Sequence, residues 1–176
     1  MRPLRRRDNR ELHDAIIETL PELVKWLPWA HLEHCRMDTR FYIHSARVSR
    51  ARRQNFELLV RTADTEEFLG LVSLHRIDWD RHVAGLGYWT RSRAWGKGYA
   101  TEAAGALVEY GFRALSLHRI EAHVAPGNSA SQKVVEKLGF QREGIAREFE
   151  FVNGRFLDHI QYSAMTWEVE GGRPGN

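Results

Sequence analysis

Apolar and polar residues alternate along three short stretches in the middle of the chain. From Asn55 to Thr62 every second position is apolar, and the longer runs Phe68 to Asp78 and His82 to Trp89 are mainly apolar. Alternation with a period of two is typical of strands with one buried face. Because only short polar turns separate these stretches, the pattern predicts three sequential strands in an antiparallel meander.

Before residue 54 the apolar residues recur every three or four positions, which indicates helices. Asp8 followed by Glu11 matches a capping box, so a first helix is predicted to begin there. A second short segment is predicted over residues 21–29, starting at its proline. A third helix is predicted over residues 38–53, with Asp38 as its N-cap.

A helix is predicted to follow the meander at about residues 100–114, with small and apolar residues on its inner side. Arg119 to Val124 then alternates again, which predicts another strand. A strand, a helix and a second strand in this order form a βαβ unit, whose two strands are parallel neighbours. Together with the antiparallel meander, this predicts an α+β fold with a mixed sheet flanked by helices.

The end of the chain is predicted to add one more helix and a hairpin. The helix covers Ser129 to Leu138, and Gly139 follows it where a C′ glycine would end it. Strands at 141–151 and 156–169 flank Asn153-Gly154, which is the signal of a two-residue type I′ turn. The last residues, 171–176, are predicted to form a disordered tail.

The composition narrows the class of protein. The chain has 176 residues, 43% of them hydrophobic, which suffices for one domain, expected over residues 1–170. Its apolar stretches fall short of the roughly 20 residues that span a bilayer, and its basic N-terminus lacks the apolar segment of a secretory signal. The single cysteine, Cys35, excludes an internal disulfide and a cysteine-based metal cluster. We therefore expect a cytoplasmic protein that does not contact a membrane.

The formal net charge is +3, and much of the positive excess is clustered. One interpretation is contact with RNA or a ribosome, since clustered arginines neutralise phosphates. The other is a solvated basic N-terminus and helix face, which is favoured because RNA-binding motifs do not accompany the charge. The clustered residues are Arg2, Arg5, Arg6 and Arg7, and then Arg47, Arg50, Arg52 and Arg53.

A turn rich in glycine and arginine joins the strand at 82–89 to the following helix. Gly96 and Gly98 have no Cβ, so backbone N–H groups there can approach a ligand closely. They lie at a helix N-terminus, where the dipole and unpaired donors favour an anion. The turn therefore predicts a phosphate or pyrophosphate site, although a glycine-rich turn with solvated arginines would have the same pattern. Three side chains add positive charge to it: Arg91, Arg93 and Lys97.

The spacing in this turn decides between known phosphate motifs. It lacks the third glycine of a dinucleotide fingerprint and the Gly-Lys-Ser/Thr of a P-loop. Arg93-Ala94-Trp95-Gly96-Lys97-Gly98 instead resembles the R/Q-x-x-G-x-G/A acetyl-coenzyme A loop of the GNAT N-acetyltransferases, in particular their RimJ/RimL-type subfamily. Further segments fit that resemblance in order and spacing over about residues 8–168: Trp26 to Trp29, Gly85 to Trp89, Gly96 to Ala103, Leu117 to Ala122, Asn128 to Ser131, Glu136 to Phe140 and Asn153-Gly154.

The resemblance implies a GNAT fold whose sheet splays open between the two central parallel strands. The pantetheine arm of acetyl-CoA would lie in that gap and bond backbone groups that need a partner. The pyrophosphate would lie on N–H groups of the glycine-rich loop. The residues implied to bind acetyl-CoA are Gly87, Tyr88, Trp89, Thr90, Arg91, Arg93, Gly96, Lys97, Gly98, Tyr99, Ala100, Thr101, Asn128 and Ser131.

The resemblance also implies direct transfer of acetyl from the thioester to an amine, which requires neither a cysteine nor a metal. Glu150 matches the position of a catalytic glutamate, whereas its neighbour Glu148 shares a strand face with it in the predicted hairpin. Ser131 is a candidate to protonate the leaving thiolate, or else it bonds back to its own helix. Backbone N–H groups near Tyr88 or Trp89 are expected to stabilise the oxyanion.

Other candidates for the base remain weaker on the sequence alone. Glu102 lies where a carboxylate favours the helix dipole in any case. The histidines have a suitable intrinsic pKa, but their spacing does not distinguish them from ordinary sheet residues. Tyr88 and Tyr99 are predicted to be packing residues, with a tyrosine acid as an alternative. The histidines considered are His75, His82 and His118.

The acceptor is expected to be an amine, either a protein N-terminal α-amine or a small amine. Trp26, Trp29 and Phe149 are predicted to form its wall, with core packing of the tryptophans as the alternative. Two other functions stay open: a non-catalytic CoA-binding or ribosome-associated module, and an RNA-binding accessory protein. Dimers are common among such enzymes, so a homodimer is one expected state.

Overall fold

The part of the chain that the structure describes contains a seven-stranded mixed sheet in the order β1-β2-β3-β4-β5-β7-β6. A computed structural model describes residues 1–166 of the chain. Within this part, neighbouring strands are antiparallel except for β4 and β5, which are parallel. The strands are β1 (Arg2–Pro3), β2 (Phe56–Arg61), β3 (Phe68–Asp78), β4 (Val83–Thr90), β5 (Arg119–Val124), β6 (Gln141–Val152) and β7 (Arg155–Met165).

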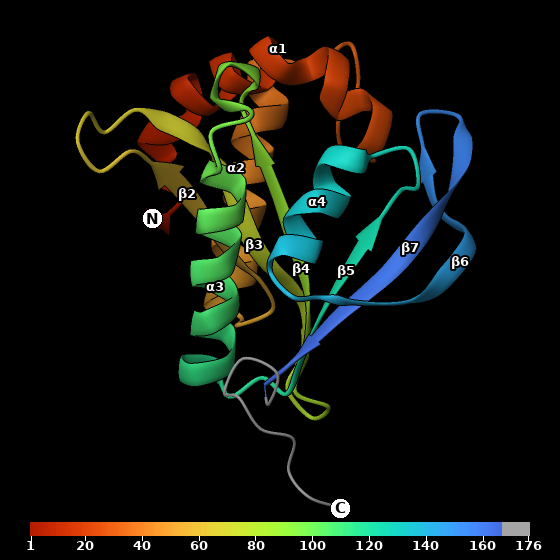
Figure 1. Ribbon diagram of the computed structural model, residues 1–176. Helices are drawn as coiled ribbons and strands as arrows, with labels where there is room; N and C mark the ends of the chain where they lie inside the picture. The colour runs from red at the N-terminus through yellow and green to blue at the C-terminus, as the bar shows by residue number, and fades with distance from the viewer. Residues whose placement is uncertain (167–176) are drawn as a thin grey trace, which may run out of the picture.

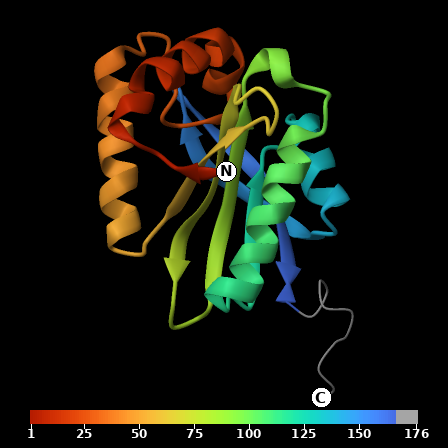
Figure 2. The same ribbon diagram turned by 90° about the vertical axis from the view of Figure 1, so that its left-hand side faces the viewer.

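Helices cover both faces of the sheet, as Figures 1 and 2 show. One face packs against α1 and α2 and the other against α3 and α4, which gives two hydrophobic cores. Strand β4 contributes to both: Leu86 faces α3, whereas Trp89 faces α1 and α2. The helices are α1 (Asn9–Trp26), α2 (Arg36–Ala51), α3 (Tyr99–Leu115) and α4 (Ser129–Lys137), with 3-10 turns η1 (Arg6–Asp8) and η2 (Ser92–Ala94).

The sheet splays open between β4 and β5, which confirms the predicted architecture. The two strands pair only where they begin, with residues 83–85 of β4 opposite residues 119–121 of β5. Beyond Gly85, β4 stays paired with β3 as far as Thr90, and β5 stays paired with β7 along its length. The backbone of β4 after residue 85 therefore borders a gap.

The hydrogen-bond pattern of β4 determines which amides face this gap. The amide of Arg91 donates to the carbonyl oxygen of Leu69 at 2.8 Å, which continues the pairing of β4 with β3. Because bonded and non-bonded positions alternate in an antiparallel pair, the amides of Trp89 and Gly87 face β3. The amide and carbonyl of Tyr88 therefore face β5 across the gap.

Two features of α1 differ from the sequence prediction. The helix continues through Pro21 to Trp26 and does not restart at the proline. The side chain of Pro21 is exposed, while Leu20 and Leu23 on either side are buried, so packing outweighs the lost backbone bond.

The predicted capping box at the start of α1 is also wrong. The carboxylate of Asp8 is buried and bonds Arg2 at 2.7 Å and the amide of Arg5 at 2.7 Å, so it fixes the preceding 3-10 turn. Glu11 forms an ion pair with Arg61 of β2. Each carboxylate thus bonds an arginine side chain, and neither caps the amides of α1.

The start of α2 moves two residues toward the N-terminus of the chain. Cys35 is the N-cap, and Asp38 is the third helical residue, whose carboxylate accepts from the Cys35 amide at 2.8 Å. The final hairpin agrees with the prediction, because φ is +45° at Asn153 and +88° at Gly154. The predicted end of its second strand near residue 169 and the predicted disordered tail at 171–176 lie outside the described residues. Within the described part, none of the helices is both long and apolar enough to cross a membrane.

Candidate active site

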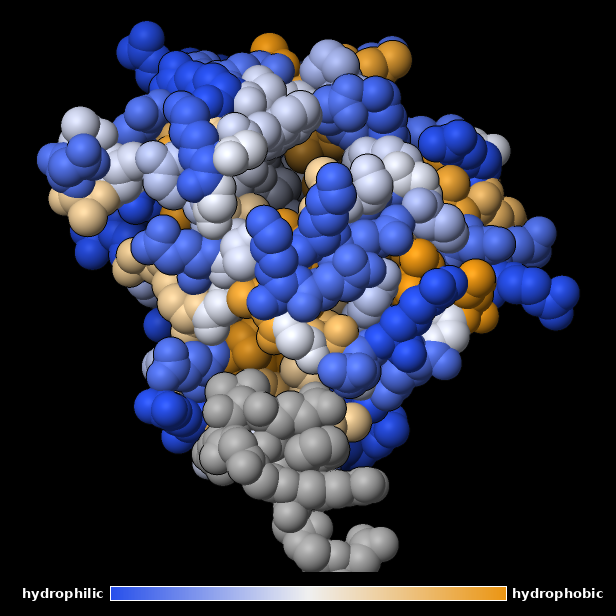
Figure 3. Space-filling view, in the orientation of Figure 1, coloured by the Kyte–Doolittle hydropathy of each residue, from blue (hydrophilic) through white to orange (hydrophobic). Residues whose placement is uncertain are grey.

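A cavity of about 320 Å³ lies at the gap between β4 and β5. Figure 3 shows the face that carries α3 and α4. It has a recess in which apolar residues lie below a rim of hydrophilic side chains. Both diverging strands line it, as do the loop after α1, the start of α4 and the final hairpin. The lining residues include Trp26, Trp29, Tyr42, Glu57, Ser73, His75, Arg76, Gly87, Tyr88, Trp89, His123, Asn128, Ser131, Phe149, Glu150 and His159.

The cavity connects the two faces of the sheet. Side chains alternate along each strand, so Tyr88 lies with the α3 and α4 core while Trp89 lies with the α1 and α2 core. Ser131 borders the cavity from the α4 side, and Trp29 borders it from the α1–α2 side. Two ligands can therefore approach the gap from opposite faces and meet within it.

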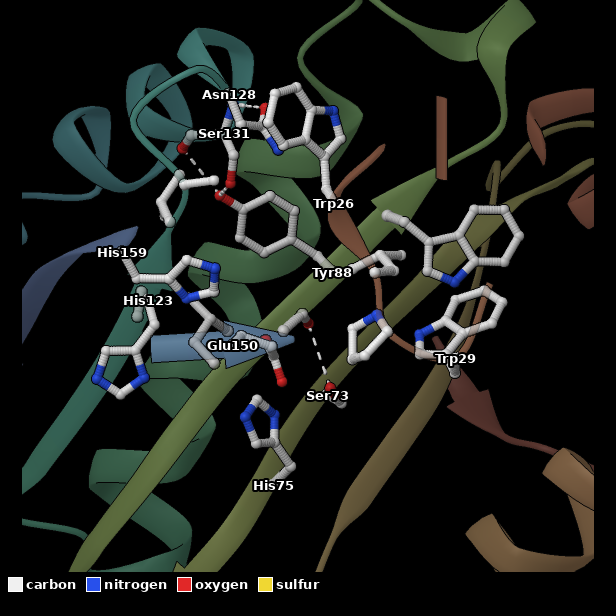
Figure 4. A pocket seen from close by; sticks show the side chains of 18 of the residues that line it. Trp26, Trp29, Ser73, His75, Tyr88, His123, Asn128, Ser131, Glu150 and His159 are labelled. Carbon is white, nitrogen blue, oxygen red and sulfur yellow. Dashed lines mark hydrogen bonds between the residues drawn. The ribbon is translucent and has the colours of Figure 1, made fainter. Parts of the chain in front are cut away.

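Tyr88 and Ser131 bond to each other across the gap. The Tyr88 hydroxyl donates to the Ser131 carbonyl oxygen at 2.9 Å and lies 2.7 Å from the Ser131 hydroxyl, as Figure 4 shows. Burial raises the pKa of the Tyr88 phenol to about 12. Tyr88 is therefore more than the packing residue predicted from the sequence, and it keeps its proton at neutral pH.

Asn128 has a structural role at the start of α4. It is the N-cap of α4, and its side-chain oxygen accepts from the Ser131 amide at 3.1 Å. This bond fixes the first turn of α4, and with it the hydroxyl of Ser131, at the mouth of the gap. A further contact of Asn128 with the cofactor arm stays a prediction.

Glu150 points into the cavity from β6, as Figure 4 shows. Glu148 is exposed and is not among the lining residues, so the two carboxylates do not share an environment. The reason is an irregularity in β6, where the pairing shifts between Ala146 and Glu150 and Glu148 has φ +50°. The predicted common face of Glu148 and Glu150 is therefore wrong.

Three histidines line the cavity, and only His75 among them was a candidate from the sequence. His123 on β5 and His159 on β7 flank the ring of Phe149, with ring centroids 4.5 Å and 5.1 Å from it. Burial lowers the pKa of each, to about 4 for His75. Neutral imidazoles therefore line the cavity near Glu150.

His123 could have been found from the alternation of β5, since its neighbours on both sides are buried residues of the opposite face. His159 carries no comparable signal. Two of the histidines considered earlier, His82 and His118, are exposed and lie at the closed end of the β4–β5 pair. Glu102 is exposed on α3 and is not among the lining residues.

The predicted aromatic wall lies beside the cavity. Trp26, Trp29 and Phe149 all line it, and a Cβ added to Gly127 would lie 3.0 Å from the Trp26 ring, so α1 reaches the loop after β5. Asn153 in the hairpin turn donates to the carbonyl oxygens of Val24 at 2.7 Å and Ala30 at 2.9 Å. The hairpin is thereby attached to the segment that carries both tryptophans.

The glycine-rich loop has the backbone that the sequence predicted. Gly96 and Gly98 have φ of +73° and +83°, and a Cβ at either position would meet nothing within 4 Å. The need for glycine is therefore conformational, and space remains beside the loop. The amides of Arg93, Ala94 and Trp95 already bond within the protein, so the predicted anion site is limited to the amides of residues 96–101.

The predicted contribution of the Arg91 side chain to this anion site is corrected by the structure. Arg91 is buried, and its guanidinium forms an ion pair with Glu18 of α1 and donates to the Phe68 carbonyl oxygen at 3.4 Å. Its charge is therefore neutralised under the loop, where it attaches the loop to α1. Arg93 and Lys97 are exposed, and Arg93 forms an ion pair with Glu67 at 2.9 Å.

Two remaining residues of the loop have defined positions. The side chain of Trp95 donates to the Thr90 carbonyl oxygen at 2.8 Å, so of the Thr90 backbone only the amide faces the gap. Tyr99 packs against the α3 core, which confirms its predicted packing role. Ala100 and Thr101 lie in the first turn of α3, where helix amides lack intrahelical partners.

Three potential metal ligands lie together outside the cavity. One ligand atom each of His31, His34 and Asp38 lies within 4.8 Å of the others. The ring of His34 also contacts Trp29, with centroids 6.3 Å apart, and bonds Thr39 at 2.9 Å. His31 and His34 lie in the connection between α1 and α2, and Asp38 lies in the first turn of α2; none of the three lines the cavity. The expectation that the chemistry requires no metal stays a prediction.

The comparison with known protein families agrees with this geometry. Residues 1–141 match the model of the acetyltransferase (GNAT) domain. The chain belongs to the GNAT acetyltransferase family. It is thus an acetyl-CoA-dependent N-acetyltransferase, and its splayed sheet is the fold of that family.

Individual relatives support the same assignment. The chain is 39% identical to the uncharacterised N-acetyltransferase p20 of Bacillus licheniformis over 66% of its own length and 64% of that protein, just under two thirds of it. It is 34% identical to YdaF of Bacillus subtilis (strain 168), provisionally named a ribosomal N-acetyltransferase, over 97% of this chain and 93% of YdaF.

Solved structures are similar over nearly the whole chain. The crystal structure of a probable acetyltransferase has a TM-score of 0.88 at 33% identity and covers 95% of this chain and 92% of its own. RimJ of Mycobacterium smegmatis, in complex with a CoA disulfide, has a TM-score of 0.87 at 26% identity and covers 96% and 82%.

Proposed function

We propose that this enzyme transfers the acetyl group of acetyl-CoA to a primary amine by direct attack in a ternary complex. The acceptor is a protein N-terminal α-amine or a small amine. The observation that carries the proposal is the cavity through the splayed sheet, which has Tyr88 and Ser131 on one side and Glu150 on the other. Acetyl-CoA and the amine would enter from opposite faces and meet in the gap.

Acetyl-CoA is assigned to the face that carries α3 and α4. The amides of residues 96–101 at the N-terminus of α3 suit its pyrophosphate, because they combine donors with the positive end of the helix dipole. The pantetheine arm contains amides, which match the backbone groups of Tyr88 that face the gap. The side chains of Arg93 and Lys97 add charge at the entrance.

The gap also supplies the groups that the transition state requires. The Tyr88 amide faces the position of the thioester carbonyl, so it is the better of the two predicted oxyanion donors. The Trp89 amide faces β3 and is not available to a ligand. Glu150 can take the proton of the amine, either directly or through water.

The Tyr88 hydroxyl is proposed to stabilise the leaving thiolate by donating a hydrogen bond, with Ser131 as its partner. A phenol with a pKa of about 12 is a much weaker acid than a thiol, whose pKa is ~8.5. Full proton transfer would therefore cost about 5 kcal/mol, at ~1.4 kcal/mol per pKa unit. A charge-assisted hydrogen bond avoids this cost and still favours departure of the thiolate.

The choice of acceptor is supported by the relatives and by the aromatic wall. YdaF, which matches nearly the whole chain, is provisionally named a ribosomal N-acetyltransferase. Trp26, Trp29 and Phe149 give the acceptor side apolar surface that suits a short peptide end or an alkyl amine. The alternative of a non-catalytic CoA-binding module is disfavoured because Glu150 and the Tyr88–Ser131 pair line the same cavity.

The test is acetyl-CoA turnover by the purified protein against N-terminal peptides, polyamines and amino acids. We expect turnover with at least one class, and Glu150→Gln should lower kcat by about 100-fold or more while acetyl-CoA still binds. Glu148→Gln is the matched control, since Glu148 is exposed on the same strand outside the cavity. Absence of acetyl-CoA binding at millimolar concentration would reject the proposal, and full activity in both variants would reject Glu150 as the base.

A further inference from the structure

A second carboxylate lines the cavity at the end far from Glu150. Glu57 lies on β2, opposite Ser73 of β3, and Ser73 lies opposite Gly87 of β4. These three residues form a row across adjacent strands, on the face that packs against α1 and α2. Because neighbouring strands lie ~4.8 Å apart, Glu57 is roughly 10 Å from the edge of the gap.

Small residues line the bottom of the cavity between the gap and Glu57, and they leave space above them. A Cβ added to Gly87 would lie 2.8 Å from the Ser73 hydroxyl, and one added to Gly85 would lie 2.5 Å from the His75 ring. Larger side chains at these glycines would fill the floor or displace His75. The structure therefore has a shallow path across Gly87 and Ser73 toward Glu57.

Aromatic residues form the sides of this path. Trp29 lies against Trp89 and Tyr42, with ring centroids 6.4 Å and 5.8 Å away. Trp89 is buried beside the path, and its indole nitrogen has no hydrogen-bond partner in the described part of the chain. The path thus suits an extended molecule with apolar sides, such as an alkyl chain.

The carboxylate of Glu57 is incompletely satisfied. The neighbouring Tyr42 hydroxyl favours its ionised form, but Glu57 Oε2 is buried and no side chain or backbone group of the described residues bonds it. Burial raises the pKa of Glu57, and the groups that act on this carboxyl do not include a cation. An unsatisfied buried polar atom costs about 1–3 kcal/mol, so the site favours a positively charged ligand.

We infer that the acceptor carries a second cationic group, which binds Glu57 while the reacting amine lies in the gap. This inference rests on the proposed function and specifies its acceptor. The shared chemistry is a primary amine joined by an apolar spacer to an ammonium or guanidinium group. A diamine has this chemistry, and so does a peptide N-terminus followed by a basic side chain.

The other charged groups of the cavity are compatible with such an acceptor. Glu150 lies near the gap, where it meets the reacting amine, and Glu57 lies at the far end. Arg76 also lines the cavity, but it is exposed at the bulge of β3. His75, His123 and His159 have lowered pKa values and stay neutral at neutral pH, so they do not repel a cation.

The test compares straight-chain diamines with monoamines in which a methyl group replaces the second amine. For the spacer that reaches Glu57, kcat/KM should favour the diamine by about tenfold to a hundredfold, as expected for a hydrogen bond to a charged group. A second arm uses peptides with lysine or norleucine next to the N-terminal residue. A preference for lysine there identifies a basic peptide as the source of the cation.

Three variants make the test specific to Glu57. Glu57→Gln keeps the shape and should remove the preference for the diamine, leaving kcat for the monoamine and the Kd of acetyl-CoA within about twofold. Glu57→Asp should shift the best diamine to a longer spacer, because the carboxylate is withdrawn by one methylene. Glu109→Gln is the control, because it removes an exposed carboxylate from the outer side of α3. It should change neither the preference for the diamine nor a preference for lysine.

The possible results separate this inference from the proposed function. Acetylation of amines without any preference for a second charge overturns the inference and leaves the proposed function intact. A preference that persists in Glu57→Gln also overturns it. Absence of acetyl-CoA binding would instead reject the proposed function itself. Thermal unfolding of each variant shows whether it is folded, and the spacer dependence of the wild-type enzyme tests the inference without any variant.

Discussion

Tyr88 combines three roles in one residue at the centre of the gap. Its amide faces the position assigned to the thioester, its ring packs against the α3 core, and its hydroxyl bonds Ser131. A strand residue can do this because its backbone and side chain point in different directions. The open edge of β4 and the start of α4 are therefore connected by a single side chain.

Removing the Tyr88 hydroxyl should separate catalysis from folding. Tyr88→Phe is expected to lower kcat by about tenfold to a hundredfold, because a donor to the leaving thiolate is lost. The Kd of acetyl-CoA should stay within a few-fold, and stability should fall by about 1 kcal/mol. Since the Tyr88 pKa is about 12, the pH profile of the wild type should show no loss of activity from this group below about pH 11.

Tyr162→Phe is the matched control for this prediction. Tyr162 is also a buried tyrosine of the same core, and its hydroxyl bonds Glu136 at 3.1 Å, outside the cavity. Its removal should affect stability and leave kcat unchanged. Full kcat in Tyr88→Phe, measured under saturating acetyl-CoA, would exclude a role for the hydroxyl in the chemical step.

At the scale of elements, contacts with α1 hold the turn from β4 to α3 in place. Arg91 is buried against Glu18 of α1, and the Ser92 amide donates to Thr19 at 3.1 Å. The following residues, Gly96 and Gly98, have positive φ and open space around them. Buried contacts thus fix the first half of the loop, and the glycines leave the amides of its second half accessible.

A side chain at Gly98 should block this accessible half. Gly98→Glu places bulk and negative charge where the pyrophosphate is assigned, so acetyl-CoA binding should fall below detection in isothermal titration calorimetry. Gly139→Glu is the matched control. It has the same backbone strain, since φ is +81° there, but Gly139 follows the C-terminal end of α4 and is not part of the loop. Both variants should lose about 1 kcal/mol of stability. Acetyl-CoA binding by Gly98→Glu at wild-type affinity would show that the loop is not the anion site.

Local patterns predict the strands and turns of this chain well, because the period of two and the turn residues act over a few positions. The strands at Phe68–Asp78 and Arg119–Val124 have the predicted bounds. The start of α1 after Asp8 agrees with the prediction, but the predicted capping box was wrong because the arginines that bond Asp8 and Glu11 are not part of any helix pattern. A prediction from periodicity does not include such partners.

The residues of the candidate site also divide into those that could be predicted from the sequence and those that could not. Ser131 and Glu150 could be predicted from the resemblance to the GNAT family, and the structure brings both to one cavity. Glu57 and His159 could not, because they reach the cavity through strand pairing between distant segments. The pairing of Glu57 with Ser73 and Gly87 depends on strand register, which the sequence does not specify residue by residue.

At the scale of the whole molecule, the sheet consists of two parts joined by little direct pairing. The first part comprises β1 to β4, the second comprises β5 to β7, and only residues 83–85 of β4 pair with residues 119–121 of β5 in the described structure. Toward the open end the parts are connected by side chains, such as the Tyr88–Ser131 bonds and those of Asn153 to Val24 and Ala30. A ligand that lies in the gap would complete the missing connection.

The arginine clusters lie outside this connection. Some of these arginines contact other residues of the protein. Arg2 bonds Asp8, and the guanidinium of Arg53 lies 4.6 Å from the centre of the Trp79 ring. Arg50 lies over Phe56 at 5.3 Å. These contacts are compatible with a solvated basic face and do not require RNA. RNA binding stays a prediction separate from the acetyltransferase.

Acetyl-CoA should therefore stabilise both parts of the sheet together. At a concentration about 100 times its Kd, a ligand that binds only the folded state adds ~2.7 kcal/mol, which for a chain of this size raises Tm by roughly 5–10 °C. Hydrogen exchange locates the effect: the Tyr88 amide should exchange faster than those of Gly87 and Trp89 without ligand, because these two face β3, and should become protected when acetyl-CoA binds. The segment over 122–125 should gain protection in parallel. If binding raised Tm but protected only the loop at 96–101, the cofactor would be held at the surface and the gap would not be its binding site.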